Sequence, residues 1–319
     1  MLKIFSALLA AVLSLTTAPT QAAADFPSKP VKIVVAFGPG SGSDILARLL
    51  GQYLQAELNT PIVVENKPGA LGQIATLSVA QSTPDGYTLG MGSSSTHSTA
   101  TFLTKNLPYN PIKDFAAVGS MNRYTFVLLV NADTPFKTPK ELVDHLKKQG
   151  TGFYGFGNAS GRVGAAHLRK LTGTQVTEVP YKSSPEAMSD LAAGRFDYMF
   201  NSWESARPFI ESGRLRAIGV MADERSPVLP DMPAVGETYP GFDFINWGGL
   251  MAPAGTPDDV IQKLNTALQT VLKNPELKNR MMELGMEVHP SSPQELADLV
   301  AQQQRAWGAA IKGADISLE

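Results

Sequence analysis

The stretch VKIVVAFGPGSGSDILARLL, residues 31–50, joins an apolar, β-rich run to an amphipathic run through a loop of glycine, proline and serine. We expect a buried strand over 31–37 and a helix over 44–58, with Ser43 as its N-cap. The apolar residues of that helix recur at helical spacing and define one buried stripe, which comprises Ile45, Leu46, Leu49, Leu50, Tyr53, Leu54 and Leu58.

The loop between this strand and this helix has the chemistry of an anion site. Its glycines let the backbone adopt positive φ angles and approach a ligand closely. The first turn of the helix offers free N–H groups and the positive end of the helix dipole, and Ser41 and Ser43 add hydroxyl donors. The loop can therefore hold a carboxylate or a phosphate without lysine or arginine. A plain strand-to-helix turn is the alternative for a loop that stands alone.

Short β-rich runs alternate with helix-like segments along most of the chain. Helical spacing predicts further helices over residues 138–148, 162–171 and 185–193, and the chain turns mainly helical from residue 255 onward. Such alternation is typical of an α/β architecture with parallel sheets covered on both faces. We expect two α/β lobes, with the last helical segment packing back onto the first lobe.

Two later stretches repeat the strand, small-residue loop and helix pattern: GMGSSSTHSTA at 90–100 and GFGNASGRVGAAHL at 155–168. Because ligands of α/β sheets bind at the carboxyl ends of the strands, these loops are expected to line a common crevice. Arg162 can reach a second anionic group of a ligand there, or it is a solvated arginine at a helix start. Tyr181 can cover the ligand, or it packs against its own lobe.

Established catalytic and cofactor motifs do not match this sequence. The dinucleotide pattern G-x-G-x-x-G has Ser43 in place of its third glycine, and the P-loop and G-x-S-x-G patterns are absent. The histidines lack metal-ligand spacing, and the chain has no cysteine. We therefore expect no enzyme activity, no cofactor and no metal. A secreted hydrolase or isomerase that uses His97, beside the serine-rich loop, is the alternative.

The N-terminal residues predict export from the cytoplasm. Lys3 is followed by a short apolar segment and by small residues that end in Ala22-Ala23-Ala24, which together are typical of a cleaved signal peptide. We expect residues 1–24 to be removed and the mature chain to begin near Asp25, in a bacterial periplasm. Lys and Arg number 27 against 29 Asp and Glu, so no strong field favours nucleic acid or an anionic membrane as partner.

The chain resembles the periplasmic solute-binding proteins of tripartite tricarboxylate transporters, also known as the Bordetella uptake gene family. The resemblance extends over essentially the whole mature chain. The stretches that carry it include FPSKPVKIVVAFGPGSGSDILARLL (26–50), STPDGYTLGMGSSSTHS (82–98), EVPYKSSPEAMSDLAAGRFDYMF (178–200) and MAPAGTPDDVIQKLNTAL (251–268).

This resemblance implies a two-lobed periplasmic-binding-protein fold that closes over a ligand held between the lobes. It implies that residues 25–125 and 246–319 form lobe 1 and that residues 126–245 form lobe 2. It also implies a ligand site that draws on both lobes. The expected ligand-binding residues are Phe37, Gly38, Gly40, Ser41, Gly42, Ser43, Asp44, Ser93, Ser94, Thr96, His97, Asn158, Ser160, Arg162, Tyr181 and Asn201.

The chain also departs from the family pattern. Gly40-Ser41-Gly42-Ser43 stands where the family commonly has Pro-Gly-Gly-Ser/Thr, and Asn201 stands where it commonly has an aspartate. Phe156 and Arg162 are added to the lobe 2 loop. Since the change at Asn201 removes one negative charge, these departures favour a ligand whose distal group is more anionic or more aromatic than that of an amino acid.

The function implied by the resemblance is the capture of a small organic carboxylate, with a dicarboxylate or an aromatic carboxylate favoured. The protein is then expected to act as a monomer that delivers its ligand to the membrane permease subunits of a tripartite tricarboxylate transporter. The alternative is a periplasmic sensor that presents the ligand-bound form to a signalling partner. The sequence does not identify the carboxylate, because backbone amides bind a carboxyl group without distinguishing the rest of the ligand.

Overall fold

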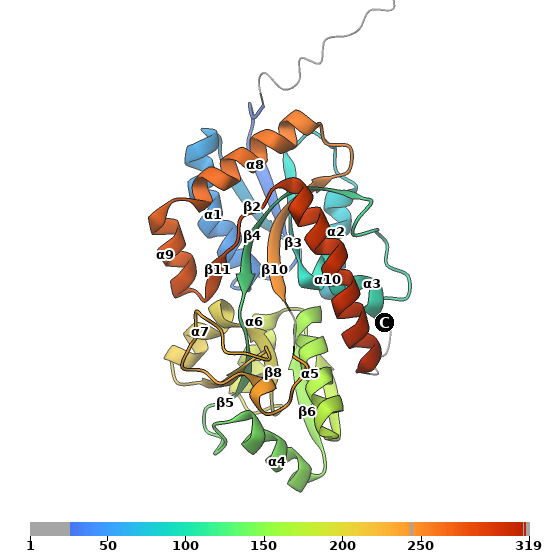
Figure 1. The fold of residues 1–319 in the computed structure, drawn as a ribbon, viewed down its shortest axis with the longest axis vertical. Helices are drawn as coiled ribbons and strands as arrows, with labels where there is room; N and C mark the ends of the chain where they lie inside the picture. Colours follow the sequence, from blue (N-terminus) through green and yellow to red (C-terminus); the bar gives the residue numbers. More distant parts are fainter. Residues whose placement is uncertain (1–25, 243–244, 315, 317–319) are drawn as a thin grey trace, which may run out of the picture.

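The computed structural model describes residues 26–242, 245–314 and 316, and folds them into two α/β lobes (Figure 1). The predicted signal peptide, residues 1–24, lies outside the described residues. The lobe boundaries given above remain a proposal, and we use them below to name the lobes.

Lobe 1 is built on one six-stranded sheet, in the order β11-β4-β10-β3-β1-β2. Strands β1, β2 and β3 run parallel, whereas β10 pairs antiparallel with both β3 and β4. The expectation of parallel sheets was therefore wrong for this mixed sheet, in which three of the five strand pairings are antiparallel. Its strands are β1 (Val31–Val35), β2 (Ile62–Asn66), β3 (Thr88–Ser93), β4 (Phe115–Tyr124), β10 (Asn246–Pro253) and β11 (Met286–Val288).

Helices cover this sheet because each buries one apolar stripe. In α1 the predicted stripe lies in the core, with Leu46, Leu50 and Leu54 buried against the sheet and α8. Burial of one such leucine contributes about 2 kcal/mol. The lobe 1 helices are α1 (Gly42–Leu58), α2 (Gln73–Ala80), α3 (Ala100–Leu103), α8 (Asp258–Leu272), α9 (Pro275–Glu283) and α10 (Pro293–Gly313), with the short turns η1 (Ala70–Gly72) and η2 (Ser94–Thr99).

Lobe 2 carries two smaller sheets. Strand β5 lies between β8 and β9 and is antiparallel to both, while β6 and β7 form a parallel pair. The strands are β5 (Phe126–Asn131), β6 (Gly152–Phe156), β7 (Val176–Pro180), β8 (Met199–Ser202) and β9 (Leu215–Val220). The helices are α4 (Pro139–Gln149), α5 (Ala159–Thr172), α6 (Ser184–Ala192) and α7 (Trp203–Glu211), with the turn η3 (Val235–Glu237).

The chain passes between the lobes along two neighbouring strands. Only Thr125 separates β4 in lobe 1 from β5 in lobe 2, and the returning chain enters β10 at Asn246 beside the end of β4. The carboxyl end of β3, the start of α1 and the starts of α5 and α7 all lie near this crossing (Figure 1). The fold thus brings the small-residue loops of both lobes to one place.

The last helix, α10, packs on lobe 1 as predicted, against β4 and η2. It also contacts α5 of lobe 2, which the sequence did not indicate. Trp307 and Ile311 of α10 belong to the same buried cluster as Phe200 and Phe242 of lobe 2. One helix therefore packs against both lobes.

Candidate ligand-binding site

A cavity lies between the lobes at the crossing strands. The empty space within it is about 390 Å³, including the part that opens to solvent. No lysine or arginine is among the described residues that line it. These residues are Phe37, Ser41, Gly42, Ser43, Ser93, Ser94, Ser95, Tyr124, Phe126, Asn158, Ser160, Ser184, Asn201, Ser202, Glu204 and Asn246.

The first predicted loop lies at this cavity, but its helix begins earlier than the sequence indicated. Helix α1 starts at Gly42, and Ser41 is its N-cap, with its hydroxyl accepting from the Asp44 amide at 3.4 Å. Ser43 lies in the first turn, so its prediction as N-cap was wrong. Two serines precede the same apolar stripe, and spacing alone does not separate them.

The first turn of α1 points its donors at the cavity. Within the described part of the chain, the amides of Gly42 and Ser43 have no hydrogen-bond acceptor. Gly40 has φ of 78°, a left-handed conformation that glycine adopts without strain. This turn lets the chain reverse into α1, so that the helix N-terminus faces the space between the lobes. Free amides at a helix N-terminus form an anion site.

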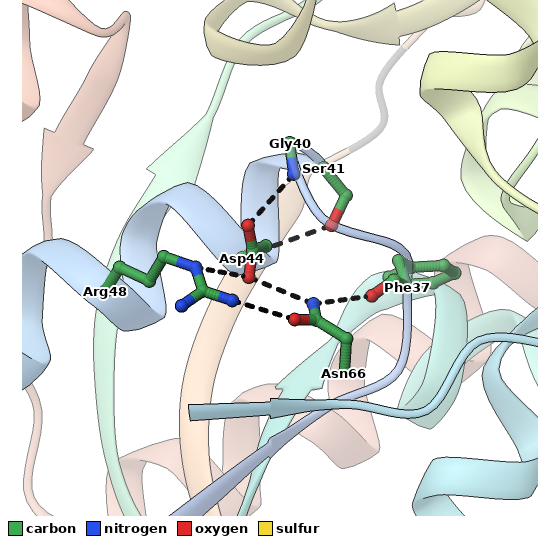
Figure 2. A network of polar contacts seen from close by, with 6 residues as sticks. All are labelled: Phe37, Gly40, Ser41, Asp44, Arg48 and Asn66. Atoms are coloured by element: carbon green, nitrogen blue, oxygen red, sulfur yellow. Dashed lines mark hydrogen bonds and ion pairs between the residues drawn. The ribbon is translucent and has the colours of Figure 1, made fainter. Parts of the chain in front are cut away.

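Asp44 supports this loop and does not line the cavity. Its carboxylate accepts hydrogen bonds from the Gly40 amide, Arg48 Nε and Asn66 Nδ2, each at 2.9 Å (Figure 2). Burial opposes its ionisation, but the hydrogen bonds from Arg48, Gly40 and Asn66 outweigh burial and lower the pKa of Asp44. The charge of Asp44 is thus used within lobe 1, and we do not retain it as a ligand contact.

The serine-rich loop forms η2, and only its first residues reach the cavity. Ser93, Ser94 and Ser95 line it, whereas Thr96 and His97 do not. The Thr96 hydroxyl accepts from the Ser93 amide at 3.2 Å and lies 2.8 Å from His97 Nδ1.

His97 is a core residue. It is 2% exposed and packs edge-on against Phe115 and Trp247. Burial lowers the pKa of His97 to about 3, so its imidazole is neutral across the physiological range. The structure therefore gives His97 an ordering role behind the loop and no place beside a ligand.

The lobe 2 loop is held by its own cap. Asn158 is the N-cap of α5, where its Oδ1 accepts from the Gly161 amide at 2.8 Å. Asn158 Nδ2 donates to Ser184 Oγ at 2.9 Å and to Asn201 Oδ1 at 3.1 Å. Asn158 and Asn201 both line the cavity, and this network fixes their orientation.

The two lobes touch beside the cavity. The Ser160 amide of lobe 2 donates to Ser95 Oγ of lobe 1 at 3.1 Å, and the Ser205 hydroxyl donates to the Gly40 carbonyl at 2.9 Å. Both contacts join the loops that approach the cavity. Predicted residue Gly38 does not line the cavity, and it lies against Ser183 of lobe 2.

Arg162 does not face the cavity. It is 1% exposed, and its Nε and Nη2 donate to the two carboxylate oxygens of Glu178 at 2.9 and 2.7 Å. Its guanidinium also lies over the Phe156 ring. Since α5 places Arg162 against β7, its charge is used inside lobe 2, and we withdraw it as the anchor of a second anionic group.

Tyr181 also lies outside the cavity. Its hydroxyl donates to Asp190 Oδ2 at 2.9 Å, and its ring packs against Phe196. The packing alternative stated for this residue matches its position.

Sequence reasoning missed several lining residues, and Glu204 is the most consequential of them. Glu204 lies in the first turn of α7 and is 2% exposed. Burial raises its pKa to about 7, and the nearby Ser202 hydroxyl and the Glu204 amide offset part of that rise. The signal for Glu204 in the sequence was its place in the first turn of a helix that begins directly after β8, which ends at Ser202. The charge absent at Asn201 is thus supplied three residues later, so the inferred preference for a more anionic ligand group loses its basis.

Two classes of feature are absent from the described residues. No cluster of three or more His, Cys, Asp or Glu side chains is placed to hold a metal ion within residues 26–242, 245–314 and 316. Within the same residues, no helix has both the length and the apolarity needed to span a bilayer.

The fold defines the class of protein: it is the two-lobed fold of periplasmic binding proteins, with a cavity between the lobes. Residues 46–316 match the family described as tripartite tricarboxylate transporter family receptor. The chain belongs to this family, whose members are solute-binding receptors and not enzymes.

Solved structures of similar proteins agree with this assignment. The periplasmic binding protein BugD is 33% identical, with a TM-score of 0.87 over 92% of this chain and 100% of that one. The Rpa4515 protein of R. palustris with adipate is 29% identical, with a TM-score of 0.89 and the same coverage. MatC of Rhodopseudomonas palustris with bound malate is 32% identical, with a TM-score of 0.84 over 90% of this chain and 100% of that one.

Proposed function

We propose that this protein captures a small organic carboxylate in the periplasm and delivers it to the permease subunits of a tripartite tricarboxylate transporter. The observation that carries the proposal is the pair of unpartnered amides, Gly42 and Ser43, at the start of α1 beside the interlobe cavity. Because no lysine or arginine lines that cavity, an anion must be held by backbone amides and hydroxyls, assisted by the helix dipole.

The comparisons support the carboxylate class of ligand. Adipate and malate, found with the two R. palustris relatives, are both dicarboxylates. The rings of Phe37, Tyr124 and Phe126 line the cavity of this chain, which suits a ligand with an apolar or aromatic body. The proposed contacts are the cavity-lining members of the predicted set: Phe37, Ser41, Gly42, Ser43, Ser93, Ser94, Asn158, Ser160 and Asn201.

The proposed mechanism is closure of the lobes around the ligand. A carboxylate held by α1 of lobe 1 and touched by Asn158 and Asn201 of lobe 2 interacts better with a closed arrangement than with an open one, and so shifts the population toward it. The closed form, acting as a monomer, then presents both lobes to the permease. Small-angle scattering checks this step, since unchanged dimensions at saturating ligand would contradict it.

The test of the proposed function removes one amide donor. Ser43→Pro deletes an N–H in the first helical turn, where proline is tolerated because the helix itself does not use that group. The matched control, Ser43→Ala, keeps the amide and loses only the hydroxyl. Calorimetry of the wild type against di-, tri- and aromatic carboxylates is expected to find a ligand with micromolar or tighter affinity, about −8 kcal/mol.

With that ligand, we expect Ser43→Pro to weaken binding by about tenfold or more, and Ser43→Ala to weaken it less. Melting temperatures of both variants establish that they are folded. If no carboxylate in the panel binds, or if the proline variant binds as tightly as the alanine variant, the amide site is wrong.

A further inference from the structure

The carboxylate of Glu204 has no cationic partner among the described residues that line its cavity. Neither of its oxygens accepts a hydrogen bond of normal geometry from the described residues, although the Ser202 hydroxyl and the Glu204 amide lie close enough to offset part of its pKa rise. The side chain crosses from α7 of lobe 2 to α1 of lobe 1, where a Cβ atom on Gly42 would overlap Glu204 Oε1. A buried carboxylate is costly unless a donor or a cation meets it, so this arrangement is incomplete as it stands.

No lysine or arginine is among the described residues that line the cavity with Glu204. Arg48 of α1 pairs with Asp44, and Arg162 of α5 pairs with Glu178. Tyr124 is the other titratable side chain in the cavity lining, and burial together with the Glu204 charge raises its pKa, so it stays neutral. The described lining of the cavity thus offers no positive charge to compensate Glu204, whereas a ligand in the cavity can bring one.

The anion site and Glu204 lie next to each other. Gly42, against which the Glu204 carboxylate packs, is also the first residue of α1 and supplies one of the free amides. A ligand carboxylate on those amides has a like charge beside it whenever Glu204 is ionised. A protonated nitrogen on the ligand removes that repulsion and gives Glu204 its missing donor.

We propose that Glu204 receives a protonated nitrogen of the ligand, so that the ligand is a carboxylate carrying a cationic amine a few bonds from the acid group that binds α1. This inference rests on the proposed function and narrows its ligand class. It makes Glu204 a specificity-determining residue: of two acids that differ only in an amino group, the protein binds the one that carries the amine more tightly.

The experiment uses matched ligands on the full mature protein. Aspartate is compared with succinate, and phenylalanine with 3-phenylpropionate, by calorimetry at pH 8. The variants are Glu204→Gln and the matched control Glu211→Gln, which removes an exposed carboxylate on the same helix. The wild type and the control are expected to bind one amino acid at least tenfold more tightly than its deaminated partner, and Glu204→Gln is expected to abolish that ratio.

The pH dependence gives a second readout. The zwitterion requires ionised Glu204, whose pKa lies at about 7, so wild-type affinity for the amino acid should rise more than tenfold from pH 5.5 to pH 8. Asp44 and His97 do not change charge in this window, because the pKa of Asp44 is lowered and that of His97 is about 3. Glu204→Gln should lose this dependence.

The outcomes separate the inference from the proposed function. If the deaminated acids bind as well as the amino acids, or bind more tightly at low pH, Glu204 acts as a protonated donor and the inference is overturned while the carboxylate site stands. If Glu204→Gln keeps the amino-acid preference, the inference is also overturned. If neither series binds and the wider carboxylate panel also fails, the proposed function itself is lost.

Discussion

The loops at the starts of α1 and α5 are similar in sequence, but the first amides of the two helices differ in their hydrogen bonding. Each leaves a strand through glycine and serine and enters a helix. In α1, Gly42 and Ser43 line the cavity, and their amides have no acceptor among the residues that the structure describes. In α5, the Gly161 amide binds its own cap and the Ser160 amide binds Ser95 across the lobes. The same local sequence pattern thus leaves amide donors without an acceptor in lobe 1, whereas in lobe 2 the corresponding donors are already hydrogen-bonded.

This difference assigns separate tasks to the lobes. Lobe 1 offers positive dipole and free donors, whereas lobe 2 offers a fixed amide network and the Glu204 carboxylate. On the proposal made above, the two lobes bind two ends of a small molecule that carry opposite charge.

The largest expected effect concerns the acid that lobe 2 contributes. Because the folded-state pKa of Glu204 is raised from 4.5 to about 7, its contribution to stability is fully present below pH 4.5 and is lost as pH rises through 7. Glu204→Gln should therefore leave the free energy of unfolding nearly unchanged at pH 4.5 and raise it by about 3 kcal/mol at pH 8. Urea denaturation at the two pH values measures this, and an equal change at both would contradict it.

The second prediction concerns Arg162, the cation of the α5 loop. If its task is structural, Arg162→Ala leaves Glu178 unpaired and lowers the free energy of unfolding by about 2 kcal/mol, less than for a fully buried pair because Glu178 is partly exposed. Ligand affinity should change less than twofold. Arg195→Ala, at an exposed pair, is the control. A loss of affinity without loss of stability would return Arg162 to the ligand site.

The two N-caps give the third and more direct comparison. Asn158 caps α5 with a 2.8 Å hydrogen bond, whereas Ser41 caps α1 with one of 3.4 Å. Asn158→Ala should cost about 1.5 kcal/mol of stability and Ser41→Ala about 0.5 kcal/mol. Thermal unfolding of both variants under the same conditions decides the order. A larger loss of stability in Ser41→Ala than in Asn158→Ala would contradict this order. It would indicate that the loop serves mainly to cap α1 and not to present its free amides.

The smallest effect is expected at the contact between the lobes. Ser205→Ala removes the hydrogen bond to the Gly40 carbonyl, which favours the closed arrangement by about 0.5–1 kcal/mol. Ligand affinity should fall by about two- to fivefold, with stability little changed. Stopped-flow dissociation rates check the origin of the loss, because a weaker contact should speed ligand release, and unchanged release would place the effect elsewhere.

Much of the fold could be predicted from the sequence because its signals are local. The stripe from Leu46 to Leu54 predicts α1, and the run from Val31 to Val35 predicts β1, since periodicity and burial coincide there. The mixed direction of the lobe 1 sheet could not be predicted, because it depends on β10, which pairs with β3 more than 150 residues away along the chain.

The site was predictable as a set of loops and not as a set of side chains. Ser93 and Asn201 lie at strand ends and line the cavity, as strand–loop patterns suggest. The direction of Arg162 is set by Glu178, and that of Glu204 by how α7 meets α1, so each depends on tertiary packing that one segment does not contain. Side-chain direction was therefore where sequence reasoning failed.

Helix α10 has a consequence for measuring motion. Its Gln304 side chain donates to the His97 carbonyl in lobe 1 at 2.9 Å, and the Ala314 carbonyl at its far end accepts from Arg169 of lobe 2 at 3.3 Å. Because one helix is bonded to both lobes, it cannot stay fixed to each of them during the proposed closure, so one of these two contacts must break or shift. Two label pairs, α10 with the exposed face of α1 and α10 with the exposed face of α4, would show to which lobe the helix stays attached.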